Sequence, residues 1–177
     1  MKNHIIFALI AVLNIISFNV YGLEERDFAF HGIKLGINEE TLTEDYPEFD
    51  CKDDASKPEL RRCKTEFDPS SVPGVFGALR GSTIDTTITF HKDKLVNINI
   101  QFYQAFFKPT TQYFVKYYGD PVVTQETIKN KQGIEKTNTV YLWRKGKESI
   151  VYWEINKDRY LNDNNDEYSR ILFLLKE

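Results

Sequence analysis

Hydrophobic and polar residues alternate with a period of two along residues 83–103, in two runs separated by a short polar turn. The inward positions are Ile84, Thr86, Ile88 and Phe90 in the first run and Val96, Ile98, Ile100 and Phe102 in the second. Two alternating runs joined by a turn are typical of an antiparallel hairpin with one buried face. The pattern therefore predicts a hairpin that needs a hydrophobic cover on one side.

The opposite face of the predicted hairpin is polar and nearly uncharged. Its positions are Asp85, Thr87, Thr89, Asn97, Asn99, Gln101 and Tyr103. Short polar side chains with a Tyr suit a flat surface that forms hydrogen bonds with another protein, so we take these seven residues as the candidate partner-binding surface. The alternative is an ordinary solvent-facing sheet, since Thr has a high preference for strands.

Local signals predict two short helices. Asn38 is a good N-cap for a first helix, which Pro47 ends near residue 46. Leu42 of this helix is expected to face the core. Pro109 is well placed as the first residue of a second helix, and Gly119 suits the position just past its end.

Further strands are expected at residues 64–67, 122–128, 139–143 and 148–155. The last strand, residues 168–175, is apolar on both faces and is therefore expected at the centre of the sheet. Residues 49–63 and 156–167 are charged or polar and are expected to be loops. Residues 68–81 are a turn-rich connection, whose apolar part, residues 72–79, is a second candidate contact surface.

The order of helix, strand and hairpin occurs twice along the chain, which suggests that one unit is used twice. The sequence therefore predicts an α+β fold in two layers. One curved antiparallel sheet would carry the two short helices on one face, as tandem helix–strand–strand units.

The first residues read as an export signal. Residues 5–18 are apolar, and Gly22 follows a small-residue pattern that suits cleavage by a signal peptidase. A membrane anchor is the alternative, but the run is shorter than the ~20 residues that a spanning helix needs. We expect a cleaved signal peptide at residues 1–22, a single domain at residues 23–177 with no transmembrane segment, and a periplasmic or secreted location.

The net charge argues against some classes of partner, and the cysteine content predicts a disulfide. Removal of residues 1–22 leaves 22 basic against 26 acidic side chains, a net charge of about −4. A mildly acidic chain has little attraction for nucleic acid or anionic lipid. Cys51 and Cys63 are the only cysteines, and an isolated pair in an exported chain predicts a disulfide. A redox or metal site is the alternative, but the pair has no Cys-x-x-Cys spacing and no nearby His.

No grouping of residues predicts catalysis, a cofactor or a metal. His31 and His91 are far apart in sequence, and neither has a ligand partner at close spacing. Residues 162–167 resemble the start of a calcium loop, but Glu167 stands where a Gly is required. Paired acids occur only in polar stretches. We therefore expect a protein that is not an enzyme and has no cofactor.

Several fold motifs carry a resemblance that covers most of the chain after residue 22. They are the segment Gly32-Ile33-Lys34-Leu35-Gly36-Ile37, the Cys51 and Cys63 pair, the hairpin around Lys92-Asp93-Lys94, the helix end Tyr117-Tyr118-Gly119-Asp120-Pro121, and Tyr141-Leu142-Trp143-Arg144. In plan the chain resembles small exported bacterial proteins typified by β-lactamase inhibitory protein and by the small lipoprotein of the outer-membrane assembly machine. The resemblance implies protein binding without catalysis. The chain lacks the lipid-anchored Cys of that lipoprotein, which argues against its particular role.

The first functional expectation is an exported, non-enzymatic protein-binding domain that acts as an inhibitor, an immunity protein or an envelope assembly factor. Its partner would be another envelope or secreted protein. The alternative is a binding protein for a glycan or lipid, or a small hydrolase, with a pocket lined by Tyr141, Trp143, Tyr152 and Trp153. A structural envelope domain without a discrete ligand is the third possibility.

Overall fold

The computed structural model describes residues 27–67, 84–163 and 167–176. Its main element is an eight-stranded antiparallel sheet with the strand order β3-β4-β5-β6-β10-β9-β8-β7. The strands are β3 (Asp50–Asp53), β4 (Leu60–Phe67), β5 (Ile84–His91), β6 (Lys94–Tyr103), β7 (Val122–Lys129), β8 (Glu135–Lys145), β9 (Glu148–Trp153) and β10 (Tyr168–Leu175). A separate two-stranded sheet is formed by β1 (Ala29–Phe30) and β2 (Ile33–Lys34). The predicted α+β class is confirmed.

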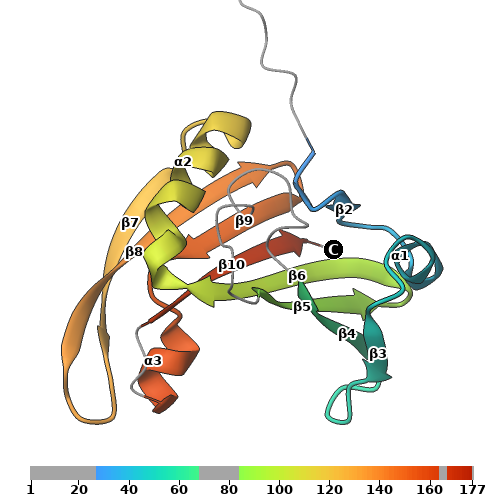
Figure 1. Ribbon diagram of the computed structural model, residues 1–177, viewed down its shortest axis with the longest axis horizontal. Helices are drawn as coiled ribbons and strands as arrows, with labels where there is room; N and C mark the ends of the chain where they lie inside the picture. The colour runs from blue at the N-terminus through green and yellow to red at the C-terminus, as the bar shows by residue number, and fades with distance from the viewer. Residues whose placement is uncertain (1–26, 68–83, 164–166, 177) are drawn as a thin grey trace, which may run out of the picture.

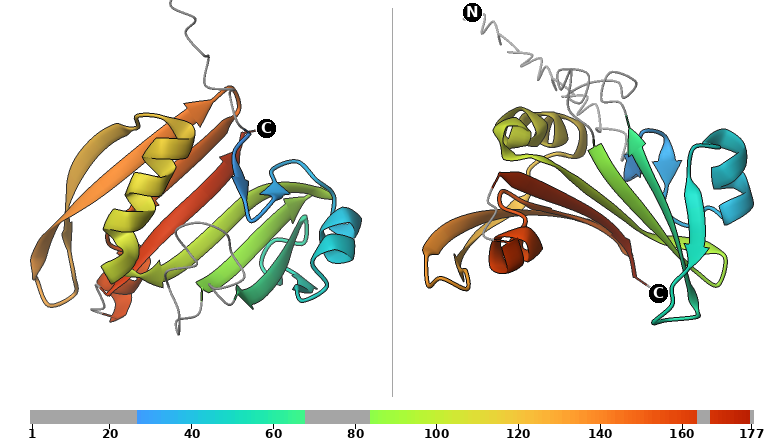
Figure 2. Two further views of the ribbon diagram at one scale, coloured as in Figure 1. Left: turned by 45° about the horizontal axis from the view of Figure 1, so that its top comes forward. Right: turned by 60° about the horizontal axis from the view of Figure 1, so that its bottom comes forward.

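The helices are α1 (Glu39–Asp45), α2 (Phe107–Tyr118) and α3 (Lys157–Asp163), with a short 3-10 helix, η3 (Gln104–Phe106), before α2. β1, β2, α1 and α2 pack against one face of the sheet, which we call the inner face, and α3 lies on the outer face (Figures 1 and 2). The two predicted helices therefore lie on one face as expected. The third helix was not predicted.

The chain is built from two halves of like order. α1 is followed by β3, β4, β5 and β6, and α2 is followed by β7, β8, β9 and β10. Each set of four strands pairs in chain order, and the two sets join through the antiparallel pairing of β6 with β10. The predicted repeated unit is therefore present in the strand order, with a fourth strand in the first half, β3, where the sequence suggested a loop.

Alternation along the strands builds the core as predicted except at Val96. The register shifts between Thr89 and Phe90, so Leu95 is buried at this point and Val96 is partly exposed. Ile84, Ile88, Ile98 and Ile100 are fully buried on the inner face. Phe114 of α2 belongs to the same core and packs on the other half of the sheet, with its ring centroid 5.6 Å from that of Trp143, 6.0 Å from Tyr152 and 6.1 Å from Phe173. The last strand, β10, lies between β6 and β9, which confirms its central position.

The helix ends follow the predicted signals. Asn38 Oδ1 accepts a hydrogen bond from the backbone N–H of Thr41 at 2.9 Å, and Leu42 is fully buried. α2 begins two residues before Pro109 because η3 leads directly into it. It ends at Gly119, whose φ of 79° is in the left-handed region.

Residues 156–167 contain a helix that the sequence analysis assigned to a loop. The stretch has no helical period of apolar residues, but Tyr160 is buried with Ile128 and Ile155 in a small second cluster. Asn156 Oδ1 accepts from the backbone N–H of Asp158 at 3.2 Å and so starts the helix. The helix is held by tertiary contacts rather than by its own pattern.

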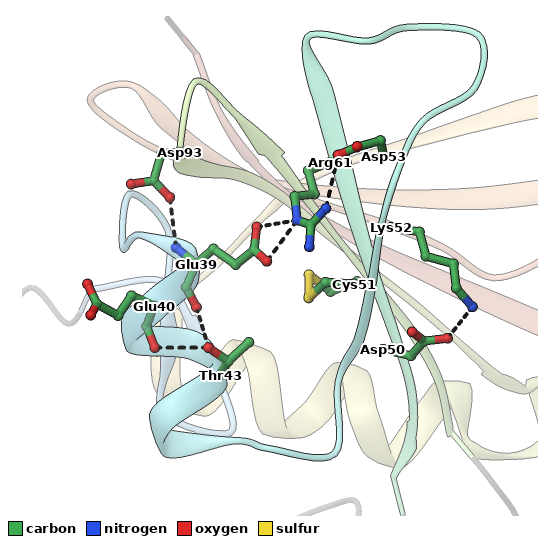
Figure 3. Close-up of a disulfide and its surroundings, with 10 residues drawn as sticks. Glu39, Glu40, Thr43, Asp50, Cys51, Lys52, Asp53, Arg61 and Asp93 are labelled. Carbon is green, nitrogen blue, oxygen red and sulfur yellow. Dashed lines mark hydrogen bonds and ion pairs between the residues drawn. A yellow bond between two sulfur atoms is a disulfide. The ribbon is translucent and has the colours of Figure 1, made fainter.

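Cys51 and Cys63 form the predicted disulfide, and they lie directly opposite each other in the β3–β4 ladder. Residues 49–63 are therefore largely a hairpin and not a loop. Figure 3 shows Arg61 reaching from β4 to both Glu39 of α1, at 2.6 Å, and Asp53 of β3, at 3.0 Å. The disulfide thus joins the two strands of the hairpin, and the ion pair of Arg61 with Glu39 ties the hairpin to α1.

Two expectations lie outside the described residues: the signal peptide at residues 1–22 and the contact loop at residues 72–79. Within residues 27–67, 84–163 and 167–176, the helices are all too short or too polar to cross a bilayer.

Reduction of the disulfide should lower the free energy of unfolding by about 2–4 kcal/mol, because the unfolded chain regains the freedom of the closed loop. Urea denaturation followed by Trp fluorescence, with and without reductant, measures the difference. Reductant should have no effect on the Cys51→Ala/Cys63→Ala variant. Thiols that react with a probe in the unreduced, denatured protein would contradict the disulfide.

Candidate functional site

The structure brings the seven predicted partner-binding residues together on the outer face of the sheet. In the β5–β6 ladder, Asp85 lies opposite Gln101, Thr87 opposite Asn99, and Thr89 opposite Asn97. These six side chains are partly exposed, and Tyr103 is 40% exposed at the end of β6. We call these seven residues the polar surface. The sheet register that the alternation predicted is the reason that they share a face.

The polar surface continues onto β4, which the sequence analysis did not include. Arg62, Lys64 and Glu66 stand opposite Thr89, Thr87 and Asp85 in the β4–β5 ladder. Residues directly opposite one another in a ladder share one face of the sheet. The polar surface therefore has a charged margin on its β4 side.

The other half of the outer face carries an apolar row that sequence reasoning missed. Leu172 of β10, Val151 of β9, Leu142 of β8 and Val122 of β7 are opposite one another in consecutive ladders, and Asn99 faces Leu172 from β6. All four are at least partly exposed, and Val122 is 63% exposed. The sequence indicates this row only through β10, which is apolar on both faces. The strand order is needed to show that the four residues lie next to the polar surface.

α3 holds one end of the polar surface in place. Arg159 donates from Nε to Gln101 Oε1 at 3.0 Å and from Nη2 to Asp85 Oδ2 at 3.2 Å. Its guanidinium also lies 3.9 Å from the ring centroid of Tyr168, which stacks on Tyr103 at 4.8 Å. Arg159 and Tyr168 therefore fix three of the seven predicted residues, Asp85, Gln101 and Tyr103.

Arg170 plays a similar part in the middle of the face. It donates from Nε to Asn99 Oδ1 at 2.8 Å and from Nη1 to Asp158 Oδ2 at 2.6 Å. Its guanidinium lies 5.7 Å from the ring centroid of Trp153. These contacts with β6, α3 and β9 thus hold the side chain of Arg170 in one position.

A polar hollow of about 540 Å³ lies between α3 and the sheet. It is lined by Asn99, Gln101, Asn156, Asp158, Arg159, Asn162 and Arg170. A second hollow, of about 460 Å³, reaches toward β3 and β4 and shares Gln101 with the first. Amide, guanidinium and carboxylate groups at such a site can donate and accept hydrogen bonds without a large net charge.

The aromatic residues of the β8–β9 hairpin do not form the pocket expected for a small molecule. Trp143 is 3% exposed and Tyr152 is fully buried, both in the core under α2. Trp153 follows Tyr152 in the strand and therefore points to the outer face. The expectation that Tyr141, Trp143, Tyr152 and Trp153 line one pocket is therefore wrong.

The ionisable groups with shifted pKa values have structural partners. Burial raises the pKa of Tyr152 well above its usual value, and the neutral hydroxyl donates to the carbonyl of Phe107 at 3.0 Å. A hydrogen bond with Tyr103 is the main reason that the pKa of Tyr168 is raised. Hydrogen bonds from Lys34 and Lys145 lower the pKa of exposed Asp27. These shifts follow from packing and ion pairing and do not pair a nucleophile with a base.

One group of side chains has the spacing of a metal site. The carboxylate of Glu39 lies within 4.8 Å of the sulfurs of Cys51 and Cys63. Both sulfurs are in the disulfide and cannot bind a metal as thiolates. His31 lies in the β1–β2 turn with its ring 5.8 Å from that of Tyr46, and His91 ends β5 opposite Lys94. Neither belongs to a group of possible metal ligands among the described residues.

No protein-family model matches the chain, and no match is found among the curated proteins or the solved structures. The class of the protein therefore rests on its own architecture, an α+β fold in which, among the described residues, α3 covers only part of the outer face of the sheet. The polar surface and the apolar row are the features of that face from which a function can be argued.

Arg159→Ala should loosen α3 and the end of the polar surface, because it removes the contacts with Gln101, Asp85 and Tyr168. We expect a loss of about 1 kcal/mol in local stability, discounted for the partial exposure of the arginine. Hydrogen exchange should become faster in α3 and stay unchanged in β8 and β9.

Lys157→Ala is the matched control in the same helix, since the ion pair of Lys157 with Glu126 joins two partly exposed side chains. Equal effects of the two substitutions on hydrogen exchange would contradict the role given to Arg159.

Proposed function

We propose that this chain is an exported, non-enzymatic protein-binding domain whose partner docks on the outer face of the sheet. The observation that carries the proposal is the continuity of the polar surface with the apolar row through the pairing of Asn99 with Leu172. Protein interfaces combine an apolar centre with a polar rim. Here both parts are supplied by neighbouring strands of one sheet.

The size of the outer face suits a protein better than a small ligand. Strands lie about 4.8 Å apart, so eight strands span about 34 Å. That width accommodates the roughly 800 Å² that a standard interface takes from each partner. A sheet is also a rigid support, and the contacts of Arg159 and Arg170 fix polar side chains before binding, which lowers the entropy cost of association.

The export part of the proposal is supported by the disulfide, which is compatible with an oxidising compartment, and by the signal expected at residues 1–22. The repeated helix and four-strand order is consistent with the plan of the inhibitory and assembly proteins that the sequence resembles. An inhibitor, an immunity protein or an envelope assembly factor would each use such a face. The partner is therefore sought among envelope and secreted proteins.

Affinity capture tests the proposal. Oxidised residues 23–177 are immobilised and exposed to envelope and secreted fractions, and a stoichiometric partner is identified by mass spectrometry. Thr87→Arg/Asn99→Arg should reduce capture at least tenfold, because two large charges would be buried at the contact. Circular dichroism should stay unchanged, because both side chains point away from the core. The melting temperature should fall by only a few degrees, since the two arginines lie opposite each other and Asn99 loses its hydrogen bond with Arg170.

Thr41→Arg/Gln112→Arg is the matched control. It changes one Thr and one amide residue by the same charge at exposed positions of α1 and α2. This variant should capture the partner as the unaltered chain does. Capture that survives the Thr87→Arg/Asn99→Arg change would refute the outer face as the binding site.

The polar hollow favours a second candidate function, binding of a hydroxyl-rich small molecule such as a glycan. Its volume lies within the range of ligand sites, and its lining groups can each donate or accept hydrogen bonds. Trp153 contacts Arg170 at its margin. The site would replace the aromatic pocket expected from the sequence.

Titration of Trp fluorescence with a glycan panel tests this second candidate. A saturable change should be lost in Trp153→Phe and kept in Trp143→Phe, because Trp143 is buried on the other face. A flat response to every glycan would count against the hollow as a ligand site.

A further inference from the structure

β7 is an open edge of the main sheet. It is the last strand in the sheet order, and it spans eight residues from Val122 to Lys129 (Figures 1 and 2). Its first four residues, Val122, Val123, Thr124 and Gln125, are uncharged and exposed, although successive side chains point to opposite faces. Val122 is 63% and Val123 is 52% exposed. Backbone groups on such an edge are available for pairing with another strand.

The opposite edge strand of the sheet, β3, has features that prevent pairing with another chain, and β7 lacks them. β3 has only four residues, three of them charged, and the disulfide ties the fourth to β4. Short length and charge are the usual means by which proteins prevent edge pairing. β7 has twice the length and carries charge only at Glu126 and Lys129, each already paired within the chain, with Lys157 and Glu135.

We propose that β7 pairs with β7 of a second copy of this chain, in antiparallel register, to form a dimer with one continuous sheet. A two-fold axis perpendicular to the sheet keeps the inner faces together and the outer faces together. Residues that pair across the axis must then point their side chains to the same face. The axis therefore lies level with one residue of each strand, which pairs with its own copy, and not level with the peptide bond between two residues.

The sequence of β7 selects the residue on the axis. An axis at Glu126 would place two like charges opposite each other, which is destabilising. An axis at Gln125 uses nearly the whole strand and places Thr124 opposite Glu126 and Val122 opposite Ile128 of the other copy. Gln125 then faces Gln125, and the two amides can bond to each other.

The neighbourhood of the strand fits this register. Ile128 belongs to the small apolar cluster with Ile155 and Tyr160, so exposed Val122 of the second copy would extend that cluster. Apolar contact is therefore complementary at both ends of the paired strands, because the two-fold axis repeats the Val122–Ile128 pair.

The dimer is expected to be of moderate strength. Pairing through one edge strand buries less than a standard interface of about 1,600 Å², so the dissociation constant should be micromolar rather than nanomolar. Sedimentation velocity on residues 23–177 from about 1 µM to about 1 mM brackets that range. A concentration-dependent shift from monomer to dimer is the expected result, and a monomer throughout would overturn the proposal.

Gln125→Lys tests the register. In the dimer the two lysines would stand directly opposite each other, about 5 Å apart at Cβ, so the dissociation constant should rise at least tenfold. The fold should be unaffected, because Gln125 is exposed. Gln112→Lys makes the same chemical change at an exposed position of α2 and should leave the dimer intact.

Mixing Gln125→Lys with Gln125→Glu should restore dimers, as heterodimers with opposite charges on the axis, detected by energy transfer between differently labelled chains. Dimers of Gln125→Lys as strong as those of the unaltered chain, or no rescue in the mixture, would overturn the β7 register. Thr87→Arg/Asn99→Arg should leave this dimer unchanged, so failure of the dimer and failure of the proposed function are separate results.

Discussion

The pairing of β6 with β10 is the interaction on which the rest of the structure depends. Seven residue pairs, from Tyr103 with Tyr168 to Asn97 with Leu174, join the two halves of the chain. On the inner face this ladder merges two sets of apolar side chains into one core. On the outer face it places Asn99 beside Leu172. Because side chains alternate with a period of two, a slip of one residue would exchange the inner and outer sets of β10 and break both arrangements.

Patterns that act over a few residues were predictable. The alternation of β5 and β6, the Asn38 cap, Gly119 at the end of α2 and the central position of β10 each depend on local chemistry that the sequence displays. β3 was missed because three of its four residues are charged. The disulfide and the ladder with β4 stabilise this strand, although its composition does not favour one. α3 was missed because one buried Tyr and contacts from β7 and β8 hold a helix that has no apolar period.

The candidate site was predictable on the hairpin and not beyond it. Asp85 and Arg159 are 74 residues apart in sequence, and Asn99 and Arg170 are 71 apart. Only the order of the strands shows that these side chains meet, and no spacing along the chain encodes that order. The same reason explains the aromatic residues of the β8–β9 hairpin. The strands that carry these residues were correctly predicted. Which of their side chains α2 covers depends on the whole fold and not on the local sequence.

The sheet consists of two meanders, β3 to β6 and β7 to β10, and this division has a consequence for how the chain folds. Within each meander the neighbouring strands are closer in sequence, whereas Tyr103 and Tyr168 pair although they are 65 positions apart. Closing long loops is entropically slow compared with forming hairpins. Each meander is therefore expected to form early, and the central ladder late. Until it closes, the edges of β6 and β10 remain exposed, so the slowest step also creates the period of greatest risk of aggregation.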